Sequence, residues 1–181
     1  LCKNYDLILV DDLSEGSLIN LPSNLRKKLI KKRIQDIKQL KTKKVNGIFH
    51  LAAQTSVPLS LTNFYKSTSN NLSSAIKVFE FSKKYSAPVV YASSSAVYGD
   101  LPLGNDQIKK FSILSPYAQD KLTIENYAKM SYKIFKVPSI GLRLFNVYGP
   151  GQTSISPYSA VIPIFIKRIL KNLPVIINGG F

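Results

Sequence analysis

The 181-residue sequence contains one cysteine, one histidine and no tryptophan, and these scarcities exclude several classes of protein. The single thiol, Cys2, rules out an internal disulfide framework and suits a reducing compartment. One cysteine and one histidine, both far from paired carboxylates, provide no metal-ligand cluster. No stretch approaches the roughly 18 consecutive apolar residues that a membrane-spanning helix needs. We therefore expect a cytoplasmic protein with no bound metal and no membrane partner.

Acidic residues are also scarce, because 10 Asp and Glu face 25 Lys and Arg, for a formal net charge of +15. Such an excess is typical of nucleic-acid binders, of proteins for anionic ligands and of genomes that favour lysine codons. The basic residues concentrate in 26–33 and 41–44, and no aromatic residue is interleaved with them. A charge run of this kind indicates a solvated face. We expect no nucleic-acid partner.

Apolar runs alternate with helical patterns along the whole chain. The sequence predicts strands at 7–10, 45–53, 89–92 and 139–145, with a fifth at 175–177, and helices at 24–33, 69–86, 116–136 and 160–171. This alternation predicts an α/β fold with a doubly wound, Rossmann-like parallel sheet. We expect one domain over residues 1–181, in which residues 150–181 begin a substrate-binding region.

Polar side chains stand where the predicted strands end, namely Asp11, His50, Ser93–Ser95 and Asn146. In a doubly wound sheet the ligand lies outside the carboxyl ends of the strands, so these residues predict a site. Asp11 is placed to accept hydrogen bonds from an adenine ribose and to repel a 2′-phosphate, which favours NAD over NADP. We give His50 no catalytic role.

Two motifs are missing from the sequence. Without a G-x-S-x-G elbow, a Ser-His-Asp hydrolase is disfavoured. A Gly-rich phosphate loop belongs about 20 residues before an acidic residue such as Asp11, and that position would precede Leu1. We expect a fold truncated at both ends, and an inactive isolated chain, because half of the pyrophosphate site would be lacking.

Ser115 to Lys121 carry the strongest local signal for chemistry. Ser115 is a favoured N-cap and Pro116 suits the first helical position, so Tyr117 and Lys121 share one helix face at i, i+4. A free tyrosine has a pKa near ~10, and a neighbouring ammonium would lower it. A hydroxyl from Ser93–Ser95 could hydrogen-bond the same substrate oxygen as Tyr117.

Together these residues resemble a known family, the extended short-chain dehydrogenase/reductases of the NAD-dependent epimerase/dehydratase type, and within it the 4-epimerases of UDP-hexoses and UDP-N-acetylhexosamines. The motifs that carry the resemblance follow in order: Val10–Ser14, Gln35–Ile37, His50–Gln54, Asn70–Asn71, Ser93–Gly99, Tyr117–Lys121, Arg143–Pro150 and Tyr158–Pro163. They cover nearly the whole chain. One departure is Gln35, which stands where the family usually has glycine.

The resemblance implies a role for each matching residue. Cofactor contacts are implied for Asp11 at the ribose, Asp36 and Ile37 at the adenine, Leu51, Ala52 and Ala53 along the pyrophosphate and ribose, and Asn70, Tyr117 and Lys121. Substrate contacts are implied for Ser56, Ser94, Asn146, Tyr158 and Val161. The implied catalytic residues are Ser94, Tyr117 and Lys121, with Ser93 and Ser95 one step away from the serine position.

The resemblance also narrows the reaction. Dehydratases and decarboxylases of the family carry a carboxyl group at the strand end, where this chain has Ser94-Ser95-Ala96. Transient oxidation by NAD at C4 of a nucleotide sugar, most similar to UDP-sugar epimerisation, is therefore favoured. The alternatives are a nucleotide-sugar reductase or dehydratase of the same family, or a non-catalytic dinucleotide-binding protein. Family members commonly form homodimers by pairing helices, which leaves a homodimer open for this chain.

Overall fold

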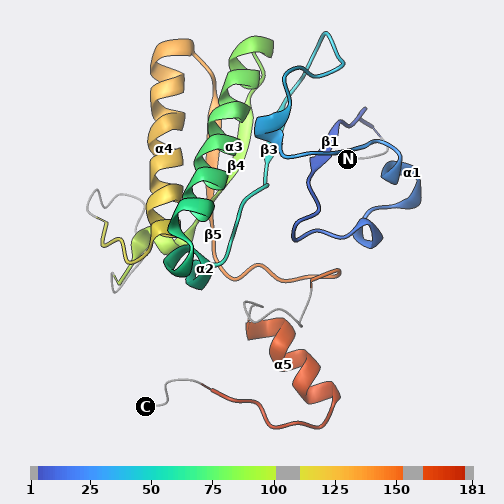
Figure 1. The fold of residues 1–181 in the computed structure, drawn as a ribbon, viewed down its shortest axis with the longest axis vertical. Helices are drawn as coiled ribbons and strands as arrows, with labels where there is room; N and C mark the ends of the chain where they lie inside the picture. The colour runs from blue at the N-terminus through green and yellow to red at the C-terminus, as the bar shows by residue number, and fades with distance from the viewer. Residues whose placement is uncertain (1–3, 101–110, 153–160, 178–181) are drawn as a thin grey trace. The chain divides into compact units, whose positions relative to one another are not determined.

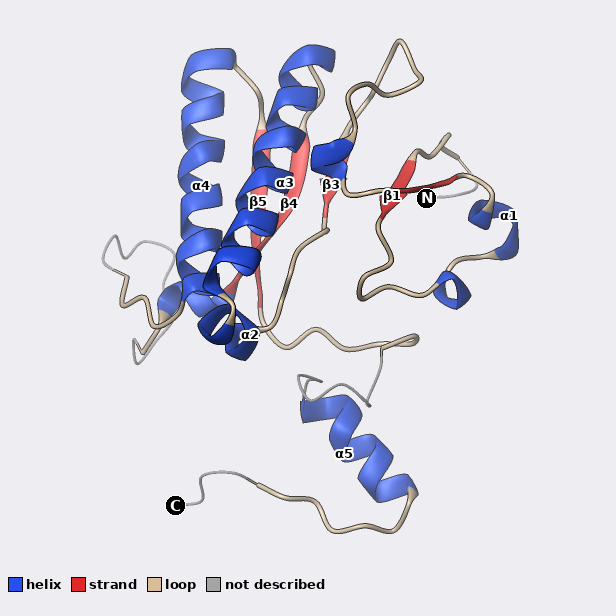
Figure 2. Cartoon of the chain, in the orientation of Figure 1, coloured by secondary structure: helices blue, strands red, loops and turns tan. Residues whose placement is uncertain are grey.

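A computed structural model describes residues 4–100, 111–152 and 161–177. The chain forms two compact units, Leu1–Arg143 and Leu144–Phe181, and each is considered by itself. Figure 1 follows the chain through both units, and Figure 2 distinguishes their helices, strands and loops.

The first unit contains two sheets whose hydrogen-bonded strands run parallel. β1 (Leu9–Asp11) pairs with β2 (Leu29–Lys31), with Leu9 opposite Leu29. The second sheet has the order β3-β4-β5, formed by Ile48–His50, Val89–Ser94 and Ser139–Leu144. β3 and β4 are parallel, and Ile48 lies opposite Val89. The carboxyl ends of β1, β3 and β4 fall at Asp11, His50 and Ser94, as the strand-end pattern predicted.

Two long helices, α3 (Phe64–Tyr85) and α4 (Pro116–Phe135), lie side by side and cover one face of the β3-β4-β5 sheet (Figure 1). A short helix, α2 (Val57–Thr62), precedes α3, and a 3₁₀ helix (Ser95–Tyr98) follows β4. The main apolar core lies between these helices and the sheet. It comprises Ala75, Val78, Phe79, Val89, Tyr91, Ile124, Ala128 and Val137.

The second unit contains one described helix, α5 (Val161–Leu170), which agrees with the predicted helix at 160–171. Among the helices that the structure describes, none combines the length and hydropathy of a membrane span.

Two predicted elements were wrong. The helix expected at 24–33 is a single turn, α1 (Ser23–Arg26), followed by strand β2. The lysine-rich sequence suits a helix locally, but main-chain pairing with β1 decides the conformation, since propensity is a weak preference. The strand expected at 175–177 is described without regular structure. An apolar triplet alone does not make a strand, because strands need a hydrogen-bonded neighbour.

Glu125 joins helix α4 to two strands of the second sheet. Arg143 of β5 donates to it from Nε at 2.9 Å and from Nη2 at 2.8 Å, and the Ser93 hydroxyl of β4 donates at 2.6 Å. The carboxylate and the guanidinium are 8% and 15% exposed. Burial alone would raise the pKa of Glu125, but the hydrogen bonds from Arg143 and Ser93 outweigh it, so the pKa is lowered.

Removing one partner of this ion pair should therefore be costly. In the full-length protein, we expect Glu125→Ala to reduce the free energy of unfolding by about 3–5 kcal/mol, since Arg143 would keep a buried charge without its carboxylate. The exposed pair between Lys77 and Glu80 provides the matched control, and Glu80→Ala should cost less than about 1 kcal/mol. Chemical denaturation measures both losses, and equal losses would contradict the structural role of Glu125.

Candidate active site

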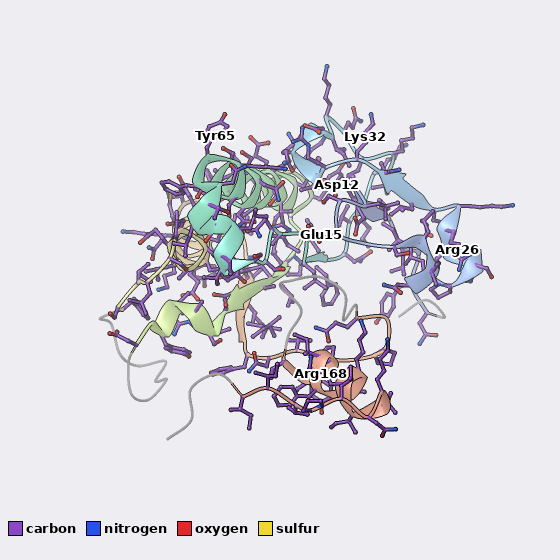
Figure 3. The ribbon with its side chains drawn as sticks, turned by 60° about the horizontal axis from the view of Figure 1, so that its bottom comes forward. Asp12, Glu15, Arg26, Lys32, Tyr65 and Arg168 are labelled. Carbon is purple, nitrogen blue, oxygen red and sulfur yellow. The ribbon has the colours of Figure 1, made fainter. Side chains whose placement is uncertain are left out.

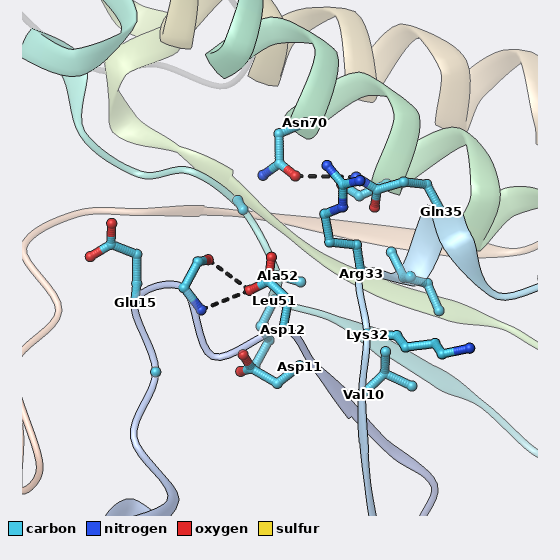
Figure 4. Close-up of a pocket in the computed structure, with 15 residues that line it drawn as sticks. Val10, Asp11, Asp12, Glu15, Lys32, Arg33, Gln35, Leu51, Ala52 and Asn70 are labelled. Carbon is cyan, nitrogen blue, oxygen red and sulfur yellow. Dashed lines mark hydrogen bonds between the residues drawn. The ribbon is translucent and has the colours of Figure 1, made fainter.

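A pocket opens at the carboxyl ends of β1 and β3, within the first unit (Figure 4). Its walls come from the segment after β1, from residues 32–35 after β2, from the exit of β3 and from α3. Five of the residues predicted to contact the cofactor line it: Asp11, Leu51, Ala52, Ala53 and Asn70. The fold thus brings together residues that are far apart in sequence.

The Asp11 carboxylate is fixed at the rim of this pocket. Its Oδ1 accepts a hydrogen bond of 2.7 Å from the backbone N–H of Leu13, which adopts a left-handed conformation with φ of 59°. A Cβ atom on Gly16 would lie 3.2 Å from Oδ2 of Asp11. A glycine at this position therefore leaves the carboxylate room to accept hydrogen bonds from a ligand.

Several pocket residues were missed by the sequence reasoning. Lys32 and Arg33 were assigned to a solvated face, yet both line the pocket together with Asp12 and Glu15, so charges of both signs surround it (Figures 3 and 4). The Asp12 carboxylate accepts hydrogen bonds from Ser14, which lower its pKa against a small opposing effect of burial. No local signal in the sequence distinguishes these pocket-lining charges from solvated ones.

Gln35 was recognised only as a departure from the family pattern, and the structure shows what it contacts. Its side-chain amide donates to Oδ1 of Asn70 at 3.2 Å, and both residues line the pocket (Figure 4). Gln35 therefore orients one of the predicted cofactor contacts.

The side chains of Asp36 and Ile37 are not brought into this pocket. Ile37 is 6% exposed and packs with Leu40 and Phe81 in a second apolar cluster. Asp36 pairs with Arg33 at 3.0 Å. Because the Ile37 side chain is committed to the core, only its backbone could face a ligand, and the predicted adenine contact of both residues stays a prediction.

Tyr117 is placed by the start of helix α4. The Ser115 hydroxyl accepts from the N–H of Ala118 at 3.2 Å and Pro116 occupies the first turn, as the sequence predicted. The N–H of Tyr117 itself donates to the Ser60 hydroxyl of α2 at 3.2 Å. Two serines therefore fix the first turn, where Tyr117 is only 8% exposed.

The three serines at the end of β4 have different partners, and this distinguishes them. Ser93 donates to Glu125, whereas Ser94 is hydrogen-bonded to the Tyr117 phenol and also accepts from the N–H of Ala96 at 3.1 Å. Ser95 begins the 3₁₀ helix. The structure thus brings Ser94, the residue chosen from the sequence, to Tyr117.

Lys121 lies one helical turn after Tyr117, with Nζ 5.6 Å from the centre of the phenol ring. The ammonium donates to the carbonyl oxygen of Ala92 at 2.9 Å. Burial lowers the pKa of Lys121 to about 8, against an opposing effect of the Asp120 charge.

We expected Lys121 to lower the pKa of Tyr117, and the structure corrects this. The pKa of Tyr117 is raised, chiefly by burial and also by the charge of Asp120, although the hydrogen bond from Ser94 lowers it. The cost of removing the Tyr117 phenolate from water outweighs the lowering of its pKa that the helix spacing to Lys121 suggested.

His50, at the end of β3, is buried and faces the charge of Lys121. Burial, followed by that charge, lowers its pKa to about 4, so the imidazole is neutral at pH 7. Because His50 is neutral, its imidazole places no additional positive charge beside the Lys121 ammonium.

Apart from Ser94, the predicted substrate residues are divided by sequence between the two units. Ser56 caps α2 by accepting from the N–H of Leu59 at 3.1 Å. Asn146 and Val161 belong to the second unit, and Tyr158 lies outside the described residues. Their contacts with substrate stay predictions.

Comparison with known proteins identifies the family. The model of the NAD dependent epimerase/dehydratase family matches residues 1–180. The chain belongs to this family.

Curated epimerase/dehydratase relatives include enzymes of two kinds. The chain is 34% identical to a putative UDP-glucose 4-epimerase of Methanocaldococcus jannaschii, over 98% of the chain and 59% of the relative. It is 32% identical to a dTDP-D-glucose 4,6-dehydratase of Dictyostelium discoideum, over 98% of the chain and 45% of the relative. The chain thus spans about half the length of these relatives.

Solved epimerases of the family have the same fold. A UDP-N-acetylglucosamine 4-epimerase of Methanobrevibacter ruminantium superimposes with a TM-score of 0.87 and 37% identity, over 94% of this chain and 57% of that one. A UDP-glucose 4-epimerase of Thermus thermophilus, solved in complex with NAD, gives 0.78 and 28%, over 92% and 55%. The predicted Rossmann-like α/β fold is confirmed.

The pocket of this epimerase-family chain fits the adenosine end of NAD. Asp11 offers a fixed carboxylate for ribose hydroxyls, Gly16 leaves space beside it, and Asn70 adds an amide across the pocket. An acidic side chain that accepts hydrogen bonds from the ribose is typical of dinucleotide-binding folds, and the contacts of Asp11 and Asn70 with NAD stay predictions.

Asp11 should therefore contribute measurably to cofactor affinity. We expect Asp11→Asn in the full-length protein to weaken NAD binding about tenfold, because a neutral acceptor forms weaker hydrogen bonds than a carboxylate. NADP binding should weaken less, since the repulsion of its 2′-phosphate is removed at the same time. Isothermal titration measures both affinities. Asp6→Asn, which alters an exposed carboxylate paired with Lys28, is the control, and an NAD affinity equal in both variants would contradict the assignment.

Proposed function

We propose that this protein is a nucleotide-sugar 4-epimerase, which interconverts C4 epimers of a UDP-hexose or UDP-N-acetylhexosamine by transient oxidation at C4. The observation that carries the proposal is the arrangement of Ser94, Tyr117 and Lys121, with the serine on the phenol and the ammonium one helical turn away. The epimerases among the relatives support the same reaction.

Tyr117 is the acid and base of the proposed reaction. Its phenolate accepts the proton of the C4 hydroxyl, and its phenol returns it, while the Ser94 hydroxyl holds the shared oxygen. Burial raises the pKa of Tyr117, and the hydrogen bond from Ser94 acts against that rise. The Lys121 ammonium lies one helical turn away, with Nζ 5.6 Å from the centre of the phenol ring. NAD, held at the pocket of Asp11 and Asn70, would supply reversible hydride transfer at C4, and return of the hydride to the opposite face would invert that carbon.

Dehydration is disfavoured because the buried carboxyl groups of helix α4 are already bound by other residues. Loss of water needs an acid to protonate the departing hydroxyl. The buried carboxylates on this helix are otherwise engaged, Asp120 by Asn71 and Glu125 by Ser93 and Arg143. These contacts support epimerisation over the dehydratase activity named for some relatives.

The residues of the site argue against two other functions. A net reductase that uses NADPH conflicts with Asp11, whose charge would face a 2′-phosphate. A non-catalytic dinucleotide-binding protein would have no need of the buried Ser94, Tyr117 and Lys121. In the proposed function the partners are NAD and a UDP-sugar, and the sugar nucleotide is contacted by Ser56, Asn146, Tyr158 and Val161. The protein acts in the cytoplasm and binds no nucleic acid. A homodimer is left open.

Tyr117→Phe in the full-length protein tests this function. We expect interconversion of UDP-glucose with UDP-galactose, or of their N-acetyl counterparts, to fall by about 10²–10⁴-fold, because the proton acceptor is lost. Bound NAD should remain. Chromatography of the UDP-sugars measures turnover. Tyr127→Phe, at a partly buried tyrosine of the same helix that packs against the core, is the control. Undiminished turnover in Tyr117→Phe would overturn the mechanism.

A further inference from the structure

Asp120 is a buried carboxylate to which the proposed mechanism gives no role. It lies on helix α4 directly before Lys121 and is 2% exposed. Burying a carboxylate is costly unless it is hydrogen-bonded or faces a positive charge. A buried carboxylate next to Tyr117 and Lys121 therefore suggests a functional role in addition to packing.

The contacts of Asp120 reach helix α3 and, through Asn71, the segment that follows β3. Asn71 of α3, 1% exposed, donates to Oδ2 of Asp120 at 3.1 Å. The same Asn71 amide accepts from the N–H of Gln54 at 2.9 Å and donates to its carbonyl oxygen at 3.2 Å. Gln54 follows directly on the pocket-lining Leu51–Ala53 segment. Asn71 therefore binds both Asp120 and the backbone of the residue next to the pocket wall.

Asp120 is also the anion that acts on both members of the proton-transferring pair. Lys121 contacts the Ala92 carbonyl oxygen of β4 and lies by the Tyr117 ring of its own helix. Its charge acts on neutral His50 of β3, and Asp120, the residue directly before it, acts on it through its own charge. Asp120 raises the pKa of Lys121 against burial, and it adds to the effect of burial on Tyr117. Burial raises the pKa of Asp120 itself, although the hydrogen bond from Asn71 and the charge of Lys121 act against that rise.

We propose that Asp120 is a positioning residue of this centre, whose carboxylate, clamped by Asn71, keeps Lys121 protonated and sets the pH range in which Tyr117 and Lys121 work. The proposal rests on the proposed function only for its kinetic test.

The direction of the pH effect follows from the signs. Asp120→Asn keeps the shape of the side chain and removes its charge, so the pKa values of Lys121 and Tyr117 both fall. The ammonium is then lost at lower pH, and the phenolate forms at lower pH. Both limbs of the pH–rate profile should move in the acid direction. A residue with only a packing role would change the rate at every pH and leave the limbs in place.

The test uses the full-length protein in wild-type, Asp120→Asn and Asp120→Glu forms. In the wild type we expect a break in the pH–rate profile near pH 8, the pKa of Lys121. It should fall by about one pH unit in Asp120→Asn, which loses a neighbouring opposite charge. Asp120→Glu should restore the position of the limbs even where its rate is lower. Glu80→Gln, at an exposed carboxylate of α3, should leave the profile unchanged.

A second measurement is independent of activity. In protein labelled with ¹³C at lysine Cε, the Lys121 signal, assigned by its loss in Lys121→Arg, should titrate near pH 8 in the wild type and at lower pH in Asp120→Asn. Asp120→Ser, a second neutral variant, should shift it in the same direction, which guards against misfolding of one variant. Absence of epimerase activity in the wild type would refute the proposed function alone. An unshifted Lys121 titration in both neutral variants would overturn the role of Asp120.

Discussion

The structure depends on one constraint, the burial of ionisable groups beneath helix α4. Tyr117, Asp120, Lys121 and Glu125 are all buried on this helix. Buried polar groups need partners, and here the partners lie on α3, β4 and β5. Glu125 fixes the strands through Ser93 and Arg143, whereas Asp120 fixes α3 through Asn71. The geometry of the site therefore follows from the same contacts that hold the helix on the sheet.

This coupling explains how a tyrosine can exchange a proton in a dry site. Burial disfavours both the phenolate of Tyr117 and the ammonium of Lys121, so neither would ionise readily alone. The hydrogen bond from Ser94 favours the phenolate, and the charge of Asp120 favours the ammonium. Neutral His50 adds no competing charge. A centre of this kind needs no metal ligand to move a proton; it needs charges at fixed positions.

Local signals in the sequence were enough to predict part of the site. Ser115 and Pro116 fixed the start of α4, and the i, i+4 spacing placed Tyr117 beside Lys121, because these features act over a few residues. The position of Asp11 at a strand end could also be predicted from the sequence. Long-range features could not. Asn71 and Asp120 meet across 49 positions, β2 forms only because β1 pairs with it, and the pKa of Tyr117 is set by burial. Ile37 shows the limit of resemblance, since its side chain belongs to the core.

The central claim is that the chain moves hydrogen from C4 of a nucleotide sugar and returns it to the same carbon. The most direct measurement follows deuterium at C4 of UDP-glucose through reaction with the full-length protein in ordinary water, by mass spectrometry and NMR of the products. Transient oxidation predicts UDP-galactose that retains deuterium at C4 and loses none to solvent. Exchange of the C4 deuterium with water, or its transfer to C6 with loss of a hydroxyl, would contradict the account.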